Sequence, residues 1–357
     1  MPIPVQRDPE LTRTRLAQWL RDTLPARDVV VGPVTVPPTA GFSAEILLCD
    51  ARWREHGRER TVPLAVRVAP TGHRIFPDLR WREQVAVQVA LADTAVPVAP
   101  VLGHEPDPQP LGAPFVVMAR VVGDVPADLP SYHRQGWLAD ATPARQRAVW
   151  WRALAAMSRL HRLDPATLPV TAAPTGDLEF YAGHLDHFGA DGNPAVAAAL
   201  AWLRAHRPPA PTAPAPLWGD ARLGNIVFAG DRPAALLDWE MADVGRPESD
   251  LAWFLHMDRF LSAGIGAARL PGLPTRAETV AYYARLLGRP LEHLAYHEVD
   301  AAFRFCVVTA RVVRLLEAGG VVPPGSDFPL HRNATALLRR RLAEAGVDLS
   351  SAGVPGL

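Results

Sequence analysis

Two neighbouring stretches of the chain decide its fold and its chemistry: residues 217–225, Leu-Trp-Gly-Asp-Ala-Arg-Leu-Gly-Asn, and residues 236–240, Leu-Leu-Asp-Trp-Glu. In the first stretch, four residues separate an aspartate, Asp220, from an asparagine, Asn225. In the second, Asp238 follows a short apolar run that is typical of a strand. The spacing predicts two apolar strands around a turn, with three polar side chains gathered where the strands and the turn meet.

These three side chains suit phosphoryl transfer, which needs a positioned acceptor hydroxyl and neutralised phosphate charge rather than covalent help from the protein. Asp220 would orient or deprotonate the hydroxyl, and Asn225 would offer a hard oxygen to Mg²⁺. Asp238 would be the anionic ligand that links the metal to the phosphates. Protein-kinase catalytic loops use the same spacing. Each residue taken singly also fits a turn or a helix cap, so the triple carries the hypothesis.

The composition is that of a globular protein large enough for two packed lobes, with 357 residues, 48% hydrophobic and 21% charged. The 37 basic and 37 acidic residues cancel, which predicts neither nucleic acid nor an anionic membrane as a partner. Every one of the 37 basic residues is arginine. A site that usually relies on lysine must therefore use arginine here.

The cysteines and the first residues predict a cytoplasmic protein. Cys49 and Cys306 lie far apart in apolar surroundings, which favours two buried free thiols over a disulfide. Residues 1–8 carry charge and prolines rather than the apolar core of a signal peptide. No apolar run reaches the roughly 18 residues that a membrane span needs. The sequence leaves the oligomeric state open.

The order of the expected elements indicates an α+β protein. A first helix places Leu16, Trp19 and Leu20 on one face, and a small antiparallel sheet covered by a single helix should follow. The expected strands and covering helix are 28–36, 43–53, 61–69, 79–92 (helix), 96–101 and 115–122. A mainly helical region comes next, with helices at 143–163, 193–206 and through most of 247–346. We therefore expect a nucleotide-binding N-lobe (1–118), a hinge (119–123) and a helical C-lobe (124–357).

Residues 217–253, which end in Asp-Leu-Ala-Trp, resemble the aminoglycoside phosphotransferase/choline-kinase-like family, and most of all its branch of kinase domains beside acyl-CoA dehydrogenases. That branch's motif usually begins His-Gly-Asp, and Trp218 replaces the histidine, which supports the loop structurally. His161 matches the family's Leu-His-x-Leu-Asp helix end, and Asp250 its Asp-Leu-Ala helix start. The resemblance covers about residues 25–260 and implies a two-lobed protein-kinase-like fold with ATP or GTP as the phosphoryl donor.

The resemblance also implies a nucleotide site in the N-lobe. Gly41 and Ser43 would belong to the loop that covers the phosphates, although an ordinary hairpin turn fits residues 40–45 equally well. Arg67 stands where kinases carry the lysine that holds the α and β phosphates, and a solvated edge-strand arginine is the alternative. Residues 118–121 would form the hinge backbone that pairs with the base, with Met118 and Arg120 among the nucleotide-binding residues.

The family expects a helix glutamate to pair with the cation at Arg67. Counting back from residues 96–98 places Gln84 in that position, with Glu83 beside it. We expect Glu83 to make the pair through a small rotation of the helix, while a solvated Glu83 is the alternative. Arg222, inside the catalytic loop, would either contact phosphate or anchor Asp238.

The acceptor site is expected in the C-lobe. Tyr181, His184 and Glu240 are candidates for contacting the acceptor, and for the first two a polar helix surface is equally consistent. Residues 251–357 hold twelve arginines against nine acidic residues, and Arg304, Arg311 and Arg314 recur at helical spacing. Such a cationic wall would suit an acidic metabolite or an acyl-CoA. Pairing of these arginines with Asp300 and Glu317, or with solvent, is the alternative.

Three functions compete. The leading one is a small-molecule kinase that phosphorylates a hydroxyl of a metabolite with Mg²⁺ and ATP or GTP. The same residues permit phosphorylation of an antibiotic, although the surplus of arginines argues against aminoglycosides. A pseudokinase-like module that binds nucleotide or metabolite without turnover is favoured by Arg67 and Gln84. The complete set of Asp220, Asn225 and Asp238 argues against it.

Overall fold

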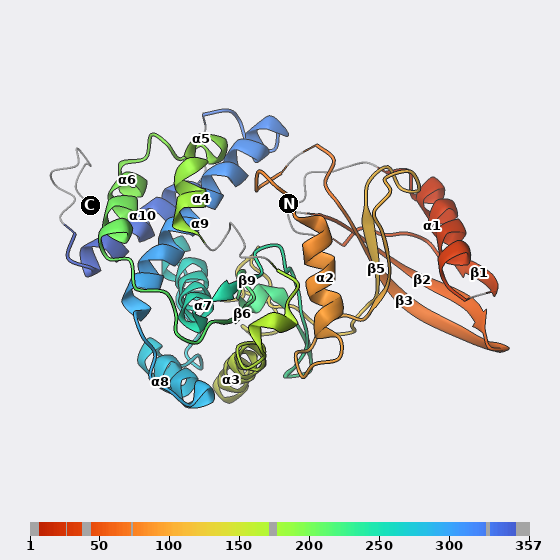
Figure 1. Ribbon diagram of the computed structural model, residues 1–357, viewed down its shortest axis with the longest axis horizontal. Coiled ribbons are helices and arrows are strands. Elements are labelled where there is room, and N and C mark those ends of the chain that lie inside the picture. The colour runs from red at the N-terminus through yellow and green to blue at the C-terminus, as the bar shows by residue number, and fades with distance from the viewer. Residues whose placement is uncertain are drawn as a thin grey trace.

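The computed structural model describes residues 7–25, 27–37, 44–72, 74–170, 177–325 and 329–347, and it confirms the two-lobed α+β architecture. Figure 1 shows a sheet with one helix on either side at one end of an elongated molecule. The remaining helices fill the other end. Both cysteines are buried free thiols, as predicted. Within the described residues, no helix combines the length and apolar character that crossing a bilayer requires.

The N-lobe is built on a five-stranded antiparallel sheet with the strand order β1-β2-β3-β5-β4. The strands are β1 (Arg27–Val31), β2 (Glu45–Glu55), β3 (Arg58–Val68), β4 (Val101–Glu105) and β5 (Phe115–Ala119). β2 and β3 pair over their full length, from Glu45 opposite Val68 to Glu55 opposite Arg58. Alternate residues of β2, from Leu47 to Trp53, are buried, which is the pattern of a strand with one face against the core.

Two helices pack on opposite faces of this sheet. Trp19 of α1 (Pro9–Thr23) packs edge-on against Phe115 of β5, with 5.0 Å between ring centroids. Gln88 of α2 (Trp81–Leu91) donates to Sδ of Met118, also in β5, at 3.0 Å. Phe115 and Met118 are three positions apart on one strand, so their side chains point to opposite faces. α2 is thus the expected covering helix, and α1 covers the face that the sequence left unassigned (Figure 1).

The C-lobe is mainly helical, as predicted. Its helices are α3 (Pro143–Leu160), α4 (Leu178–Gly183), α5 (Leu185–Phe188), α6 (Pro194–Ala205), α7 (Pro247–Leu261), α8 (Arg276–Leu287), α9 (Leu294–Ala318) and α10 (Pro329–Glu344). Buried aromatic and aliphatic side chains of α3, α7 and α9, such as Trp150, Phe254 and Phe303, form one core. Trp150 meets Phe254 edge-on at 4.8 Å between centroids.

Two small two-stranded sheets of the C-lobe flank the catalytic loop. β7 (Ile226–Ala229) pairs with β8 (Arg232–Leu236), and these are the two predicted strands around a turn. β6 (Ala215–Leu217) pairs with β9 (Asp243–Gly245), a pairing that the sequence did not indicate. The loop between β6 and β7 therefore has both of its ends fixed in β-structure.

The chain from the N-lobe enters the C-lobe against β7. Asp124 and Phe228 exchange two backbone hydrogen bonds of 2.8 and 2.9 Å. A Cβ at Gly123 would lie 2.4 Å from the carbonyl oxygen of Phe228, so only glycine permits this approach. The loop between β3 and α2 also reaches the C-lobe, where Ile75 and Phe76 join its core. These contacts join the two lobes outside the site itself.

Candidate active site

The predicted catalytic loop, Trp218–Asn225, is buried and tightly constrained. Gly219 has φ +87°, and a Cβ there would lie 2.1 Å from the carbonyl oxygen of Met241. An L side chain would meet both a backbone conformation that it avoids and a steric clash. A short 3₁₀ turn, Leu223–Asn225, ends the loop and leads directly into β7. The loop therefore presents Asp220 and Asn225 from a fixed backbone.

Both carboxylate oxygens of Asp220 are held by donors. Oδ1 accepts a 2.8 Å hydrogen bond from Nε1 of Trp253, and Oδ2 accepts one of 2.7 Å from Nδ2 of Asn225. Nε of Arg222 lies 2.9 Å from Oδ2 and 3.1 Å from Oδ1. Asp220 as a whole is 8% exposed. The structure thus joins Asp220 and Asn225 in one hydrogen-bonded unit.

Burial changes the acidity of this carboxyl group. Desolvation and the nearby carboxylate of Asp238 raise the pKa of Asp220 to about 7, while the hydrogen bonds from Trp253 and Asn225 act in the opposite direction. A carboxylate with a pKa near neutrality is a better proton acceptor than an ordinary surface aspartate.

Asp250 ties the start of the catalytic loop to helix α7. Its Oδ2 accepts from the backbone N–H of Trp218 at 2.7 Å, and its Oδ1 accepts from Gly219 at 2.9 Å. His161, at the end of α3, lies with Nε2 2.9 Å from Oδ2, and its Nδ1 lies 2.6 Å from the Tyr283 hydroxyl. A histidine that donates through Nε2 and accepts at Nδ1 satisfies both contacts. Asp250 and His161, which the sequence matched to the family's motifs, are thus supports of the loop.

Trp218, which stands where the family's histidine is usual, supplies a hydrogen-bond donor of its own. Its indole Nε1 donates to the carbonyl oxygen of Leu237 at 2.7 Å. The next residue, Asp238, has φ +59°, which is rare for a residue other than glycine. Trp218 therefore links the catalytic loop to the backbone that carries Asp238.

Asp238 faces Arg67 across the site. Oδ1 of Asp238 lies 3.3 Å from Nη2 of Arg67, whose Nη1 donates to Oε1 of Gln84 at 2.7 Å. The guanidinium also lies over the ring of Trp81, 5.1 Å from its centroid. Arg67 is therefore not a solvated edge-strand arginine. It spans from helix α2 in the N-lobe to Asp238 in the C-lobe.

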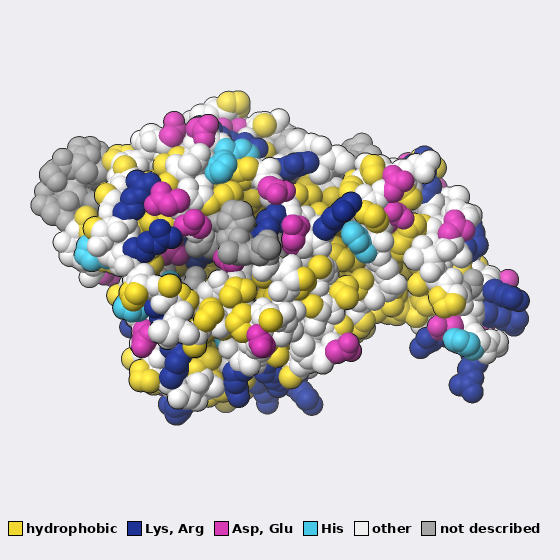
Figure 2. Space-filling model, in the orientation of Figure 1, with side chains coloured by type: hydrophobic (Ala, Val, Ile, Leu, Met, Phe, Trp, Pro, Cys, Tyr) yellow, Lys and Arg dark blue, Asp and Glu magenta, His cyan; other side chains and the backbone are white. Residues whose placement is uncertain are grey.

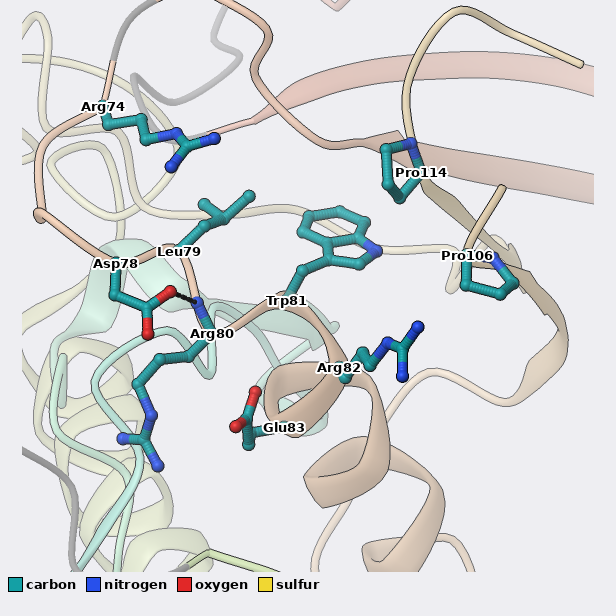
Figure 3. A pocket seen from close by; sticks show the side chains of 9 residues that line it. All are labelled: Arg74, Asp78, Leu79, Arg80, Trp81, Arg82, Glu83, Pro106 and Pro114. Carbon is teal, nitrogen blue, oxygen red and sulfur yellow. Dashed lines mark hydrogen bonds between the residues drawn. The ribbon is translucent and has the colours of Figure 1, made fainter. Parts of the chain in front are cut away.

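The expectation that Glu83 pairs with Arg67 is wrong, because Gln84 makes the contact. Gln84 is 3% exposed and faces the sheet, while its Nε2 donates to the carbonyl oxygen of Leu79. Neighbouring helix positions point about 100° apart, so Glu83 is turned away from Arg67. Glu83 lies on the wall of a hollow at the start of α2 that Arg74, Arg80 and Arg82 also line (Figure 3). The volume of this hollow is about 290 Å³.

Asn225 and Asp238 fit a divalent metal ion by their donor chemistry. Because Asp220 offers only acceptors, the amide nitrogen of Asn225 must face it, which turns Oδ1 to the other side. That amide oxygen and the Asp238 carboxylate are hard oxygen ligands. Among the described residues, no cluster of three or more acidic, histidine or cysteine side chains could hold a metal. Mg²⁺ in nucleotide sites needs only one or two protein ligands, because phosphates and waters supply the others.

Four further residues were predicted to bind the nucleotide, and the structure describes two of them, Met118 and Arg120. Gly41 and Ser43 lie outside the described residues. Met118 is 9% exposed and packs between the sheet and α2. The backbone N–H of Arg120 donates to the carbonyl oxygen of Pro63 at 2.8 Å, and its guanidinium lies 3.8 Å from Asp50. The donors of Arg120 therefore serve the N-lobe, and its contact with a base stays a prediction.

Arg304 and Tyr181 are not exposed acceptor ligands. Arg304 is 4% exposed, and its Nε lies 2.9 Å from Asp300, one helical turn away, which was the alternative prediction. Its Nη2 donates to Ser249, and its guanidinium lies 5.2 Å from the ring centroid of Trp253. Tyr181 has no exposed surface and packs among the aromatic rings of the C-lobe core. Arg304 therefore lies against Trp253, and Tyr181 belongs to the core.

Arg311 and Arg314 do not form a cationic wall either. Nε of Arg311 donates to the backbone carbonyl of Arg74 at 3.0 Å, and Nη1 of Arg314 donates to that of Asp186 at the same distance. Arg311 therefore fastens the β3–α2 loop to α9. His184 is half-buried at the end of α4, where Nδ1 lies 2.8 Å from the carbonyl oxygen of Phe180. Figure 2 shows arginine and acidic side chains interspersed on the face in view.

Glu240 lies near the catalytic loop. It is half-buried, and its charge acts on both Tyr181 and Arg222. The contact of Glu240 with the acceptor stays a prediction.

Three contacts of the site had no sequence-based prediction. Trp253 donates to Asp220, Asp128 pairs with Arg222, and Asp250 holds the loop backbone. Trp253 lies three residues after Asp250 on α7, so the two share a helix face, and that spacing is the one signal the sequence offered. Asp128 comes from an irregular segment about ninety residues before the loop, and nothing local marks it. Arg222 contacts Asp220 rather than Asp238.

The fold is of the two-lobed, protein-kinase-like class, and its candidate site gathers polar side chains at the spacing of a kinase catalytic loop. The chain belongs to the phosphotransferase enzyme family, whose model matches residues 50–297. Curated relatives include acyl-CoA dehydrogenase family member 11 from Gallus gallus, which is 29% identical over 47% of this chain and 22% of its own. Acyl-CoA dehydrogenase family member 10 from Mus musculus is 25% identical over 70% of this chain and 24% of its own. The chain thus spans about a quarter of the length of these relatives.

Solved structures share the fold. One is a protein from Ralstonia eutropha described as an aminoglycoside phosphotransferase, with a TM-score of 0.69, 20% identity, and coverage of 93% of this chain and 98% of that one. Another is a thermostable mutant of an aminoglycoside phosphotransferase in a ternary complex with AMP-PNP and hygromycin B. Its TM-score is 0.54 and its identity 16%, over 93% of this chain and 99% of that one. At these identities, the likeness concerns the fold.

Proposed function

We propose that this protein is a small-molecule kinase that transfers the γ-phosphoryl group of a nucleoside triphosphate to a hydroxyl of a small acceptor. The observation that supports this most is the convergence of Asp220, Asn225 and Asp238 with Arg67. Asp220 and Asn225 share a hydrogen bond of 2.7 Å, and Asp238 lies 3.3 Å from Arg67. A base, two oxygen ligands and a phosphate-binding cation are the parts that such a transfer requires.

Each side chain has a role in the proposed reaction. Arg67 binds phosphate oxygens of the nucleotide through its planar fork. Asn225 and Asp238 would hold Mg²⁺, whose contribution is to neutralise charge on the phosphates. Asp220 accepts the proton of the acceptor hydroxyl. The hydroxyl oxygen bonds to the γ-phosphorus as the bond to the β–γ bridging oxygen breaks.

We propose that the two lobes have the separate functions that the sequence suggested. Residues 1–118 would bind the nucleotide, residues 119–123 would form the hinge, and residues 124–357 would carry the catalytic loop and the acceptor site. Gly123 supports a boundary here, because the chain meets β7 of the C-lobe directly after it. The base would pair with backbone groups near Val121, beyond the N–H groups that Ala119 and Arg120 use within the N-lobe.

Arg304 and Arg311 have partners within the protein, so they no longer favour an acidic acceptor as the sequence suggested. Several of the curated relatives are named as acyl-CoA dehydrogenase family members, and hygromycin B occupies one structural neighbour. An acceptor screen should therefore contain hydroxyacyl-CoA esters, hydroxy acids and several antibiotic classes. The pseudokinase alternative predicts stabilisation by one of these compounds without nucleotide and without turnover.

Thermal shift measurements with ATP test the nucleotide and metal part of the proposal. We expect ATP with Mg²⁺ to raise the melting temperature of the wild-type protein more than ATP alone does. Asp238→Asn should lose most of that metal-dependent shift. Asp231→Asn, in the turn between β7 and β8, is the matched control and should keep it. Equal shifts with and without Mg²⁺, in the wild type, would argue against a metal-dependent kinase.

A further inference from the structure

Arg222 is a half-buried cation in the candidate active site. Its Nε contacts both oxygens of Asp220, at 2.9 and 3.1 Å, and its Nη1 pairs with Oδ2 of Asp128. The charges of Asp238 and Glu240 also act on it. One guanidinium thus lies among four carboxylates, at the place where the acceptor hydroxyl and the triphosphate must meet if Asp220 is the base.

Arg222 is not needed to orient Asp220. Trp253 donates to one carboxylate oxygen at 2.8 Å and Asn225 to the other at 2.7 Å, so two neutral donors already fix the group. A positive charge this close would weaken a proton acceptor if orientation were its whole purpose. A role that requires the charge itself accounts better for an arginine at this position.

The guanidinium also has a donor to spare. Nε and Nη1 are engaged by Asp220 and Asp128, while Nη2 has no hydrogen-bond partner among the residues that the structure describes. The side chain is 21% exposed, whereas that of Asp220 is 12% exposed. A phosphoryl oxygen can bind at this edge of the fork while Asp128 keeps the arginine in place.

We propose that Arg222 is a catalytic residue that binds the phosphoryl group during its transfer, and that Asp128 is the positioning residue that holds it there. This inference rests on the proposed kinase function. The acceptor oxygen bonds to the γ-phosphorus, the bond to the β–γ bridging oxygen breaks, and the nucleoside diphosphate leaves with that electron pair. The hydroxyl proton goes to Asp220. Arg222 exchanges no proton and stabilises the negative charge on the oxygens of the phosphoryl group.

The geometry around Gly224 agrees with a fixed position for Asp128. A Cβ at Gly224 would lie 2.6 Å from Oδ1 of Asp128, so the loop approaches this carboxylate as closely as glycine allows. Asp128 therefore packs against the catalytic loop backbone as well as pairing with its arginine. Asp128 thus contacts the catalytic loop at two residues, Arg222 and Gly224.

Chemical rescue tests this role. Phosphoryl transfer to water, or to an acceptor found in the screen, is measured for Arg222→Ala with and without millimolar guanidinium or ethylguanidinium ions. We expect kcat to fall about 10²- to 10³-fold, with the Kd for AMP-PNP changed by less than about threefold. The added ions should restore kcat about tenfold or more. Arg222→Lys, which keeps the charge but loses the fork, should retain an intermediate rate.

Asp128→Asn and a surface variant complete the set. Asp128→Asn should lower kcat without weakening nucleotide binding, because it releases Arg222 but leaves Asp220 intact. Arg259→Ala, which removes a pair with Glu344 on the far side of α7, is the matched control and should keep the wild-type rate. If Arg222→Ala fails to fold, Arg222→Lys and Asp128→Asn carry the test through the same split between kcat and Kd.

The outcomes separate this inference from the proposed function. A wild-type protein with turnover whose Arg222→Ala variant keeps its kcat, or whose loss is not rescued by guanidinium, overturns the role of Arg222 alone. A loss confined to nucleotide affinity does the same. A wild-type protein that transfers phosphoryl to neither water nor any acceptor removes the proposed function and this inference with it.

Discussion

Trp253 and Asp220 are joined by a hydrogen bond of 2.8 Å from the indole Nε1 to Oδ1 of the carboxylate. Trp253 is 3% exposed, and Arg304 lies over its ring with 5.2 Å between the guanidinium carbon and the ring centroid. Arg304, which the sequence suggested as an acceptor ligand, therefore packs on Trp253, and Trp253 in turn holds Asp220. These contacts connect α9 through α7 to the catalytic loop.

Replacing Trp253 by phenylalanine should slow transfer without preventing nucleotide binding. The variant keeps an aromatic ring for Arg304 but removes the N–H that donates to Asp220. A hydrogen bond to a charged group is worth about 1.5–3 kcal/mol, so we expect kcat to fall about 10- to 100-fold. Steady-state kinetics and AMP-PNP binding check this. Trp151→Phe, on the outer side of α3, is the matched control, and an equal loss there would show that the effect is general destabilisation.

Gly219 and Gly230 offer a paired test of the loop's backbone. Both have positive φ, +87° and +64°, but a Cβ at Gly219 would meet the Met241 carbonyl at 2.1 Å, whereas nothing lies within 4 Å at Gly230. Gly230→Ala should cost about 1 kcal/mol of unfolding free energy. Gly219→Ala should cost about 3 kcal/mol or more and abolish activity. Similar urea midpoints for the two variants would contradict the constraint inferred for the catalytic loop.

Asp258 should make stability depend on pH. It is 5% exposed and accepts from Tyr132 at 3.0 Å, from Arg269 at 2.6 Å, and contacts Nε2 of His133 at 3.1 Å. Burial alone would raise the pKa of this carboxyl, but His133 and Arg269 outweigh it and hold the pKa below its usual value. Because the folded-state pKa is the lower one, Asp258 stabilises the fold above the unfolded pKa of about 4 and loses this contribution as the pH falls further.

Asp258→Asn should therefore lower the unfolding free energy by about 3 kcal/mol at pH 7. The difference between variant and wild type should shrink as the pH is lowered below about 4. Urea unfolding followed across pH 3 to 7 checks both points. Asp231→Asn, which removes a partly exposed pair with Arg145, should cost less than about 1 kcal/mol at any pH. A gap that stays constant down to pH 3 would show that the Asp258 charge is not what matters.

The sequence predicted those parts of the molecule that local patterns determine. Alternating burial in β2 and the helical period of α3 are set by neighbouring residues, so both elements were expected within a few positions. The grouping of Asp220 and Asn225 follows from one short loop with fixed spacing. Asp238 was expected near Asn225 because the second strand of a hairpin ends beside the start of the first.

Contacts between distant segments were beyond the sequence. Counting along α2 could not decide between Glu83 and Gln84, because a difference of one residue turns a side chain by about 100°. The spacing of Arg304 and Arg311 showed that they share a side of α9. It did not show that the first faces the core beneath Trp253 or that the second meets the β3–α2 loop. Asp128 and Arg222 meet through tertiary structure alone.

The most direct test of the account is phosphoryl transfer from γ-labelled ATP to a panel of hydroxyl compounds, with wild-type protein and Asp220→Asn compared at equal nucleotide saturation. Asp220→Asn keeps the shape of the side chain and acceptors for Trp253 but removes the base. We predict label transfer to at least one acceptor by the wild type, and a loss of more than about 10²-fold in the variant with AMP-PNP binding retained. Wild-type turnover by Asp220→Asn would contradict the assignment of the catalytic base and, with it, the proposed reaction.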